Sequence, residues 1–346
     1  MHANNQNIDQ TAQPVCSVCI ANYNGIEVIH ECITSIMQQN FDLQVEIIVH
    51  DDASTDNSVE FIRTHFPNIV LIESKENVGF CVSNNRMVQK ACGKYILLLN
   101  NDAALFPDAL RTLYGYAETQ KKPGILGLRQ YNAKTGRLID CGIMLDPFMN
   151  SIPNTNIDRT DVAMLMGACI WIPKKLWEMT GGFPEWFHTM HEDMYICCIA
   201  RLLGFDVLVV PQSGYWHQVG WSLGGGKVVE NRLATSVQRR FLSERNRLFV
   251  ISLCYPVPFI YFVLPLQILL LILEGIILSI VKRKIIVKTI YLNSIAELWR
   301  KAEKIYRIRR ETQAKCCITS WCFLSVFSLM PHKLRMLLKY GFPEVY

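Results

Sequence analysis

Charged residues are scarce in this chain, and the signatures of several protein classes are missing. Only 19% of its 346 residues are Asp, Glu, Lys or Arg, and 50% are hydrophobic, which excludes intrinsic disorder of the whole chain. Residues 1–13 are polar and lack an apolar stretch, so we expect a disordered N-terminus and no secretory signal. Without export, the thirteen cysteines are expected to be free thiols.

Two enzyme signatures are also absent. A nicotinamide-dependent dehydrogenase needs Gly-x-Gly-x-x-Gly after its first strand, whereas residues 22–27 read Asn-Tyr-Asn-Gly-Ile-Glu. A zinc-protease helix needs His-Glu-x-x-His, and Tyr195 stands where the second histidine after His191 would be. These absences argue against both classes.

The C-terminal part of the chain combines an apolar segment with a basic one. Residues 259–281 are almost entirely apolar and, as a helix at ~1.5 Å per residue, would be about 34 Å long, enough to cross a bilayer core. Pro265 and Glu274 favour a re-entrant or interfacial helix instead, with spanning as the alternative. Residues 282–346 contain fourteen Lys and Arg against four Glu. This charge predicts contact with anionic membrane lipid rather than with nucleic acid.

The first 120 residues alternate short β-rich runs with amphipathic runs. The predicted strands are 15–20, 45–49, 69–72 and 95–99, and the predicted helices are 58–65 and 108–119. A further strand is expected over 202–210. The alternation predicts an α/β fold, Rossmann-like, with a mostly parallel central sheet flanked by helices. Ligands of such sheets bind at the carboxyl ends of the strands.

Polar clusters follow three of these strands. They are Asn22-Tyr23-Asn24, Asp51-Asp52 and Asn100-Asn101-Asp102. A carboxylate such as Asp102 at a strand end can hold a hard cation that bridges to a diphosphate, although an Asx turn or helix cap is the structural alternative. Glu192-Asp193 suits a general base beside a carboxylate that orients a hydroxyl, or simply a helix start. His217 is either a metal ligand or a stacked structural residue.

The ordered combination of these motifs resembles the family 2 glycosyltransferases with the GT-A fold, most closely their rhamnosyltransferase-like branch. The matching motifs are residues 17–24, Asp51 to Asp56, Asn77-Val78-Gly79-Phe80 with Asn85, Leu98 to Asp102, Gly167-Ala168-Cys169 with Gly181-Gly182-Phe183, Glu192-Asp193, and Trp216-His217-x-x-Gly220-x-Ser222. The resemblance covers roughly residues 14–250. It implies a GT-A domain there and a helical, membrane-associated region over 251–346.

The resemblance also implies roles for individual residues. Asp193 would be the catalytic base, and Asp102 and His217 would hold a divalent metal, Mg²⁺ or Mn²⁺. Asp51 would contact the nucleotide base. The substrate-binding residues that it implies are Tyr23, Asn24, Asp51, Asn77, Asn101 and Glu192.

The implied protein is an inverting glycosyltransferase that takes a sugar from a nucleotide-diphosphate donor. Its acceptor would be a saccharide or a lipid-linked saccharide, at the cytoplasmic face of the membrane, in surface polysaccharide assembly. The alternative is a non-catalytic, membrane-bound sugar-nucleotide-binding or assembly protein of the same fold. Tyr195 and Ile199 favour that alternative, because the family often has Asp and Arg there; the retention of Asp102, Asp193 and His217 argues against it.

Overall fold

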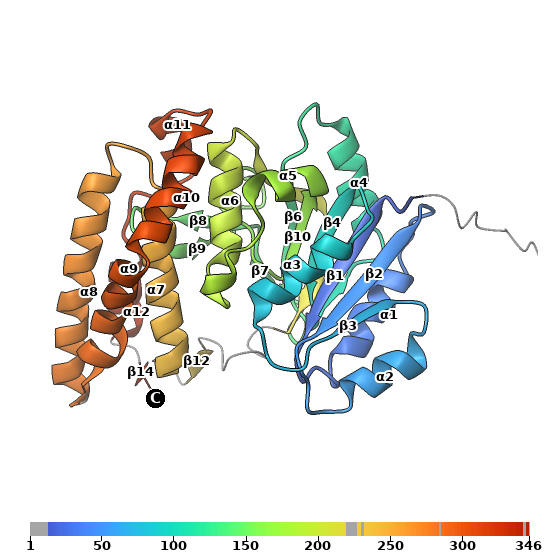
Figure 1. Ribbon diagram of the computed structural model, residues 1–346, viewed down its shortest axis with the longest axis horizontal. Helices are drawn as coiled ribbons and strands as arrows, with labels where there is room; N and C mark the ends of the chain where they lie inside the picture. Colours follow the sequence, from blue (N-terminus) through green and yellow to red (C-terminus); the bar gives the residue numbers. More distant parts are fainter. Residues whose placement is uncertain (1–12, 219–226, 230–231, 284, 342–343, 346) are drawn as a thin grey trace, which may run out of the picture.

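The computed structural model describes residues 13–218, 227–229, 232–283, 285–341 and 344–345 (Figure 1). The strands are β1 Cys16–Asn22, β2 Val45–Asp51, β3 Val70–Glu73, β4 Tyr95–Asn100, β5 Ala103–Leu105, β6 Ile125–Asn132, β7 Leu138–Asp140, β8 Ile143–Leu145, β9 Ser151–Pro153, β10 Cys169–Pro173, β11 Val207–His217, β12 Lys227–Val229, β13 Arg232–Thr235 and β14 Glu344–Val345. The segment 1–13 that we expected to be disordered lies, except for Gln13, outside the described residues.

The helices alternate with the strands in the first half of the chain and dominate the second half. The α-helices are α1 Ile29–Met37, α2 Ser58–His65, α3 Phe80–Lys90, α4 Ala109–Thr119, α5 Lys174–Thr180, α6 Glu192–Leu202, α7 Val237–Cys254, α8 Ile260–Lys282, α9 Asn293–Arg300, α10 Ala302–Ala314, α11 Ser320–Leu324 and α12 His332–Tyr340. A 3₁₀ turn, η1, covers Glu185–Phe187, and a π-helix, η2, covers Val287–Leu292.

Nine strands of the described residues form one mixed sheet, in the order β3-β2-β1-β4-β10-β6-β11-β5 with β7 beside β6. The strands β3, β2, β1 and β4 are parallel, and β10 is antiparallel to β4. Asn22 pairs with Asp51, and the neighbouring Ala21 pairs with Asn100. The three polar clusters predicted at strand ends therefore lie level at one edge, and the α/β prediction is confirmed.

Two hydrophobic cores lie on opposite faces of the sheet. One face is covered by α1, α2 and α4, whose buried residues include Ile29, Ile62 and Leu110. The core on the other face reaches from β4 through α6 and α7 to Phe323 and Val326. The C-terminal helices thus complete a core that begins at the sheet.

The strand predicted over 202–210 has the wrong bounds. Leu202 is the last residue of α6, and the strand β11 begins only at Val207. Gly204 adopts a left-handed φ of 72° in the turn between them, which interrupts the apolar run. The strand also continues past Val210, through a change of register before Gly214, to His217.

The apolar segment predicted over 259–281 is the single helix α8, at the left edge of Figure 1. Among the described residues it is the one helix long and apolar enough to cross a membrane, with a mean hydropathy of 2.4 over its most apolar window. Position 250, the expected end of the catalytic domain, lies inside the continuous helix α7. The division of the chain at 250 stays a prediction.

Candidate active site

Asp51 ties the loops after β1 and β2 together. Its carboxylate accepts hydrogen bonds from Asn22 Nδ2 at 2.9 Å, from Ser54 N at 2.9 Å and from Ser54 Oγ at 2.6 Å. The residue is 2% exposed, so these protein donors take the place of water. Asp51 therefore braces the edge of the sheet from within.

Tyr23 and Asn24 lie in the loop that follows β1. Asn24 has a φ of 49°, in a region that Asn tolerates better than most residues, and its Oδ1 accepts a hydrogen bond from Thr55 N at 2.7 Å. The resulting turn leaves Tyr23 half exposed. Asn24 thus shapes the loop, while the ring of Tyr23 is open to a ligand.

The segment that contains Asn77 is held by Asp52. The Asp52 carboxylate accepts hydrogen bonds from Val78 N at 2.7 Å and from Gly79 N at 2.9 Å. Gly79 has a φ of 89°, and a side chain there would overlap the ring of His188, so this position requires glycine. Asn77 itself is exposed beside the end of β2.

Asp102 and His217 meet at the end of β4. His217 is the last residue of β11 and pairs with Ala103, which brings its Nε2 within 3.1 Å of Asp102 Oδ1. Both residues are 7% exposed. Asn101 Nδ2 donates to Asn22 Oδ1 at 2.9 Å, which links this pair to the cluster around Asp51.

This pair has the donor set of a divalent metal site completed by substrate. A carboxylate oxygen and an imidazole nitrogen are ligands for Mn²⁺, and two protein ligands plus diphosphate oxygens are usual for such ions. The second ring nitrogen of His217 is buried and has no hydrogen-bond partner within the described residues. The same residues hold no group of three or more His, Cys, Asp or Glu that could bind a metal, so within the described part of the chain this pair would need further ligands from the substrate.

Glu192 and Asp193 begin α6. Asp193 Oδ2 accepts a hydrogen bond from Gly167 N at 2.9 Å, and its Oδ1 accepts one from Met194 N at 2.7 Å. Burial raises the pKa of Asp193, although these N–H donors oppose the shift. Burial and the neighbouring Asp193 raise the pKa of Glu192 to about 8. Glu192 is therefore protonated near neutral pH, and because the charge of Asp193 is one cause of this shift, Asp193 is the carboxyl that ionises first.

Gly167 connects this pair to the end of β4, where Asp102 and His217 lie. The next residue, Ala168, accepts a hydrogen bond at its carbonyl from Asn100 N at 3.0 Å, and Cys169 pairs with Leu99 of β4. Asp193 is thus held one strand from the end of β4, where Asp102 and His217 lie. The proposed base and the proposed metal ligands share one edge of the sheet.

The loop before α6 depends on two residues that our sequence reasoning missed. Asn246 Nδ2, on α7, donates to the carbonyl oxygens of Phe187, Thr189 and Met190, at 3.1, 2.8 and 2.8 Å. Arg245 adds a bond of 2.8 Å to the Phe187 carbonyl. The sequence of α7 gave no signal that singles them out, because they stand among several other polar residues, and their partners lie nearly 60 residues away in the chain.

These bonds stabilise a loop of unusual backbone geometry. Three of its residues other than glycine have positive φ: His188 at 66°, Met190 at 74° and His191 at 67°. Such conformations cost of order 1–3 kcal/mol each and persist only where the surroundings impose them. Because His191 directly precedes Glu192, the loop sets the position of Glu192 and Asp193 at the start of α6.

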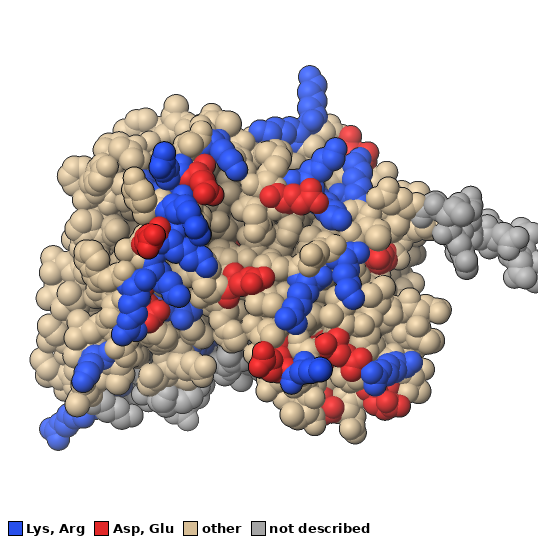
Figure 2. All heavy atoms as spheres, in the orientation of Figure 1, with Lys and Arg blue, Asp and Glu red and all other residues tan. Residues whose placement is uncertain are grey.

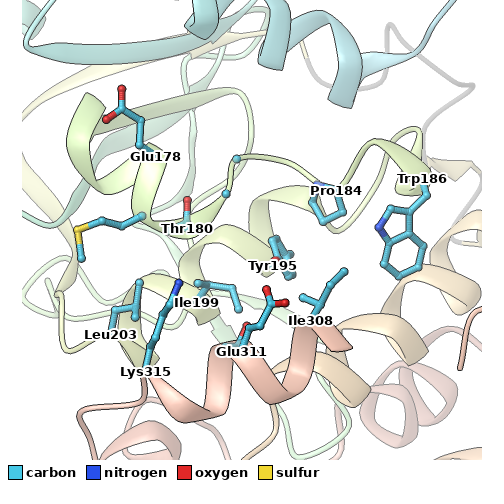
Figure 3. A pocket seen from close by; sticks show the side chains of 14 residues that line it. Glu178, Thr180, Pro184, Trp186, Tyr195, Ile199, Leu203, Ile308, Glu311 and Lys315 are labelled. Atoms are coloured by element: carbon cyan, nitrogen blue, oxygen red, sulfur yellow. The ribbon is translucent and has the colours of Figure 1, made fainter. Parts of the chain in front are cut away.

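Tyr195 and Ile199 do not face the carboxylates at the start of α6. Both line a cavity of about 290 Å³ between α6 and α10 (Figure 3). Its other walls include Trp186, Ile308, Glu311 and Lys315, whereas Glu192 and Asp193 are not part of it. Tyr195 and Ile199, which differ from the residues that the family often has at these positions, therefore belong to the packing of α10 on α6. Their presence gives no support to a non-catalytic protein.

The remaining motif residues are partly described. Asn85 clamps the Gly-Gly-Phe turn, because its Nδ2 donates to the Phe183 carbonyl at 2.9 Å and its Oδ1 accepts from Phe183 N at 3.0 Å. Gly220 and Ser222 lie outside the described residues.

Comparison with known proteins gives one family. Residues 17–179 match the model described as "Glycosyl transferase family 2". The chain is 27% identical over 168 residues to the poly(ribitol-phosphate) beta-glucosyltransferase of Bacillus spizizenii, which covers 47% of this chain and 25% of that protein. The sequence matches span a third or less of the length of the first curated relatives.

Solved structures show the same fold over most of the chain. TarS 1-349 of S. aureus, solved in complex with UDP, is 15% identical, with a TM-score of 0.53 over 86% of this chain and 90% of that one. The mannosyltransferase PcManGT of Pyrobaculum calidifontis, solved with GDP-Man and Mn²⁺, is 15% identical, with a TM-score of 0.52 over 88% of this chain and 86% of that one. At these identities the likeness concerns the fold, which is GT-A.

Proposed function

We propose that this chain, whose residues 17–179 belong to glycosyl transferase family 2, moves a sugar from a nucleotide-diphosphate donor to a saccharide or lipid-linked saccharide with inversion at the anomeric carbon. The observation that carries the proposal is the common location of Asp193 and the Asp102–His217 pair at one edge of the sheet. A base and a diphosphate-binding site are the two parts that such a transfer requires.

Asp193 acts as the base in this proposal. The acceptor oxygen attacks the anomeric carbon, the bond from that carbon to the donor diphosphate breaks, and its electron pair leaves with the nucleotide diphosphate. The proton of the acceptor hydroxyl passes to Asp193, whose raised pKa makes it a stronger base than an ordinary aspartate. Glu192, protonated at neutral pH, orients the acceptor by a hydrogen bond. One such displacement inverts the configuration.

The donor binds, in this proposal, along the ends of β1, β2 and β4. The exposed Tyr23 and Asn77 contact the nucleotide. Asp51, Asn24 and Asn101 hold the loop that carries Tyr23, and Asp52 holds the segment that carries Asn77. Asp102 and His217 would hold Mn²⁺ or Mg²⁺, which would act as a Lewis acid toward the diphosphate oxygens. The donors named in the titles of neighbouring structures, UDP-GlcNAc and GDP-Man, support a nucleotide sugar without selecting one.

The proposed setting is the cytoplasmic face of a membrane. Nucleotide sugars are expected there, and the relative from Bacillus spizizenii is named for a polymer, poly(ribitol-phosphate). A lipid-linked acceptor would suit the apolar and basic C-terminal helices.

A donor screen tests this function. The purified full-length chain is incubated with Mg²⁺ or Mn²⁺ and a panel of nucleotide sugars, with and without simple saccharide acceptors, and nucleotide release is measured. We expect release from one donor, accelerated by an acceptor, and much slower release with Asp193→Asn. The contrary outcome is that the parent protein and the Asp193→Asn variant bind the same donor, but no nucleotide is released from any donor by either of them. The protein would then be a binding module, and the proposal would be wrong.

A further inference from the structure

The outer side of α8 carries a continuous stripe of exposed apolar side chains. Its members alternate four-residue and three-residue spacings, which keeps them on one face of the helix. They are Phe262, Leu266, Leu269, Leu273, Ile276 and Ile280, with exposed fractions between 43% and 72%. A soluble protein rarely exposes so large an apolar surface without a partner. We call these six residues the α8 stripe.

The opposite side of α8 is packed along the protein. Its buried residues include Gln267, Leu271, Gly275 and Leu278. A side-chain carbon at position 275 would come within 2.7 Å of the ring of Tyr291, so this glycine permits close packing on η2. The helix is therefore held along its length, and the α8 stripe faces away from the protein.

Glu274 fixes this orientation with charge. Its carboxylate pairs with Arg240 of α7 and with Lys333 of α12, the latter at 2.6 Å. Burial alone would raise the pKa of Glu274, but Lys333 and Arg240 hold it at about 2, so the carboxylate stays ionised. A crossing of the bilayer by α8 alone would separate three charges that the fold brings together.

Basic residues lie at the end of the stripe. Arg283 and Lys288 are both exposed where α8 ends and η2 begins. Figure 2 shows an edge free of charged side chains where α8 lies, with Lys and Arg at its lower end and with Lys and Arg interspersed with Asp and Glu along the helices beside it. An apolar strip with a basic border is complementary to a bilayer that contains anionic lipid.

We propose that the α8 stripe lies in the interface of an anionic membrane, with α8 along the surface and both of its ends on the same side. The apolar side chains enter the acyl boundary, and Arg283 and Lys288 contact lipid phosphates. Figure 1 has α8 at the edge of the molecule farthest from β1 and β2, which keeps the catalytic edge in water. A second copy of the chain fits less well, because the one carboxylate on α8, Glu274, is already paired and leaves the basic end without an anionic partner.

Vesicle sedimentation with the full-length chain tests this surface. The protein is mixed with vesicles of pure phosphatidylcholine or of phosphatidylcholine with about 30% phosphatidylglycerol, and the bound fraction is measured. Leu269→Glu with Leu273→Glu should lower the partition coefficient at least tenfold on both. Arg283→Gln with Lys288→Gln should lower it about 30-fold on the anionic vesicles alone, at roughly fivefold per charge.

A matched control distinguishes the stripe from apolar surface in general. Met37 and Leu43 are exposed to 64% and 42% on the far side of the sheet, so Met37→Glu with Leu43→Glu should bind both vesicles like the parent protein. All variants should unfold at the parent temperature, since the changed residues are exposed. Binding of the α8 variants equal to the parent, or a parent that forms dimers through the stripe and binds no vesicle, would overturn the proposal.

Tags at both ends of the chain test whether α8 lies on or spans the membrane. In cells that express the full chain, proteolysis of intact and opened cells should give the same accessibility for the N-terminal and C-terminal tags. Opposite accessibility of the two tags would mean that α8 spans the bilayer. Neither test depends on catalytic activity. If the proposed reaction is not observed, the vesicle and tag experiments therefore still decide whether α8 binds the membrane surface.

Discussion

At the scale of single residues, the pair Glu192–Asp193 makes the sharpest prediction. Asp193→Asn should lower the transfer rate by about 10²–10⁴ and leave donor binding intact, because only the proton acceptor is lost. Glu192→Gln should cost far less, since an amide replaces a protonated carboxyl that also donates a hydrogen bond. Transfer rates measured with saturating donor, beside calorimetric donor binding, separate the two. A rate for Asp193→Asn near that of the parent would exclude it as the base.

The same residue predicts the pH dependence. Burial raises the pKa of Asp193 above its ordinary 3.8, and the base works only when ionised. The rate should therefore rise with pH through that raised pKa, and the acid limb should lie above pH 3.8. The limb should keep its position in Glu192→Gln, because Glu192 is still protonated when Asp193 titrates. If the acid limb of the pH–rate profile moves to lower pH in Glu192→Gln, the ionisation of Glu192 contributes to that limb, and its assignment to Asp193 alone is wrong.

The Asp102–His217 pair predicts the metal dependence. Transfer should stop with excess chelator and return with Mn²⁺ or Mg²⁺, and His217→Ala should raise the metal concentration needed for half-maximal rate. The control is His65→Ala, an exposed histidine on α2, which should leave that concentration unchanged. Full activity in chelator would mean that the pair has a structural role alone.

At the scale of elements, the strand ends were predictable and the loop before α6 was not. Apolar strands followed by Asn, Asp and Tyr predicted the edge at β1, β2 and β4, because strand pairing aligns neighbouring ends by itself. The junction at 202–210 was misread because an apolar run does not distinguish a buried helix end from a strand. The 187–191 loop could not be foreseen, since its conformation depends on Asn246, which only tertiary packing brings there.

The prediction for the loop before α6 therefore concerns a substitution of Asn246. Asn246→Leu keeps the volume but removes the donor to three carbonyls, so the free energy of unfolding should fall by about 1–3 kcal/mol. Transfer should slow with little change in donor affinity, because the loop leads to Asp193 and not to Asp51. Asn293→Leu is the matched control, since Asn293 is exposed and its one side-chain hydrogen bond, to the Thr289 carbonyl, stays within its own helical turn. Denaturant unfolding and donor titration measure both effects. Equal behaviour of the two variants would remove Asn246 from this role.

At the scale of the whole molecule, the sequence motifs end much earlier along the chain than the hydrophobic core does. Every described motif lies before residue 218, yet the core on the α6 side of the sheet continues to Phe323 and Val326. Ser328 N also donates to the Leu145 carbonyl at 2.7 Å, and Tyr255 Oη donates to the Pro147 carbonyl at 2.7 Å. Sequence composition reveals the apolar and basic character of the C-terminal region, but it cannot reveal that this region returns to the β8–β9 hairpin.

A chain cut after residue 250 should therefore fail to fold rather than become a soluble enzyme. The cut divides α7, whose residues Leu248 and Val250 are fully buried, and it removes α8, α9 and α10, which pack against this helix. Phe323 and Val326, members of the same core, are lost with them. Lost burial of this kind costs about 25 cal/mol per Å² of apolar surface, and several large side chains are affected at once. We expect the truncated chain in inclusion bodies, or soluble without a cooperative thermal transition, whereas the full chain with Leu269→Glu and Leu273→Glu should keep its transition and lose only vesicle binding. A soluble, cooperatively folding 1–250 fragment would instead mean that the catalytic domain ends where its motifs do.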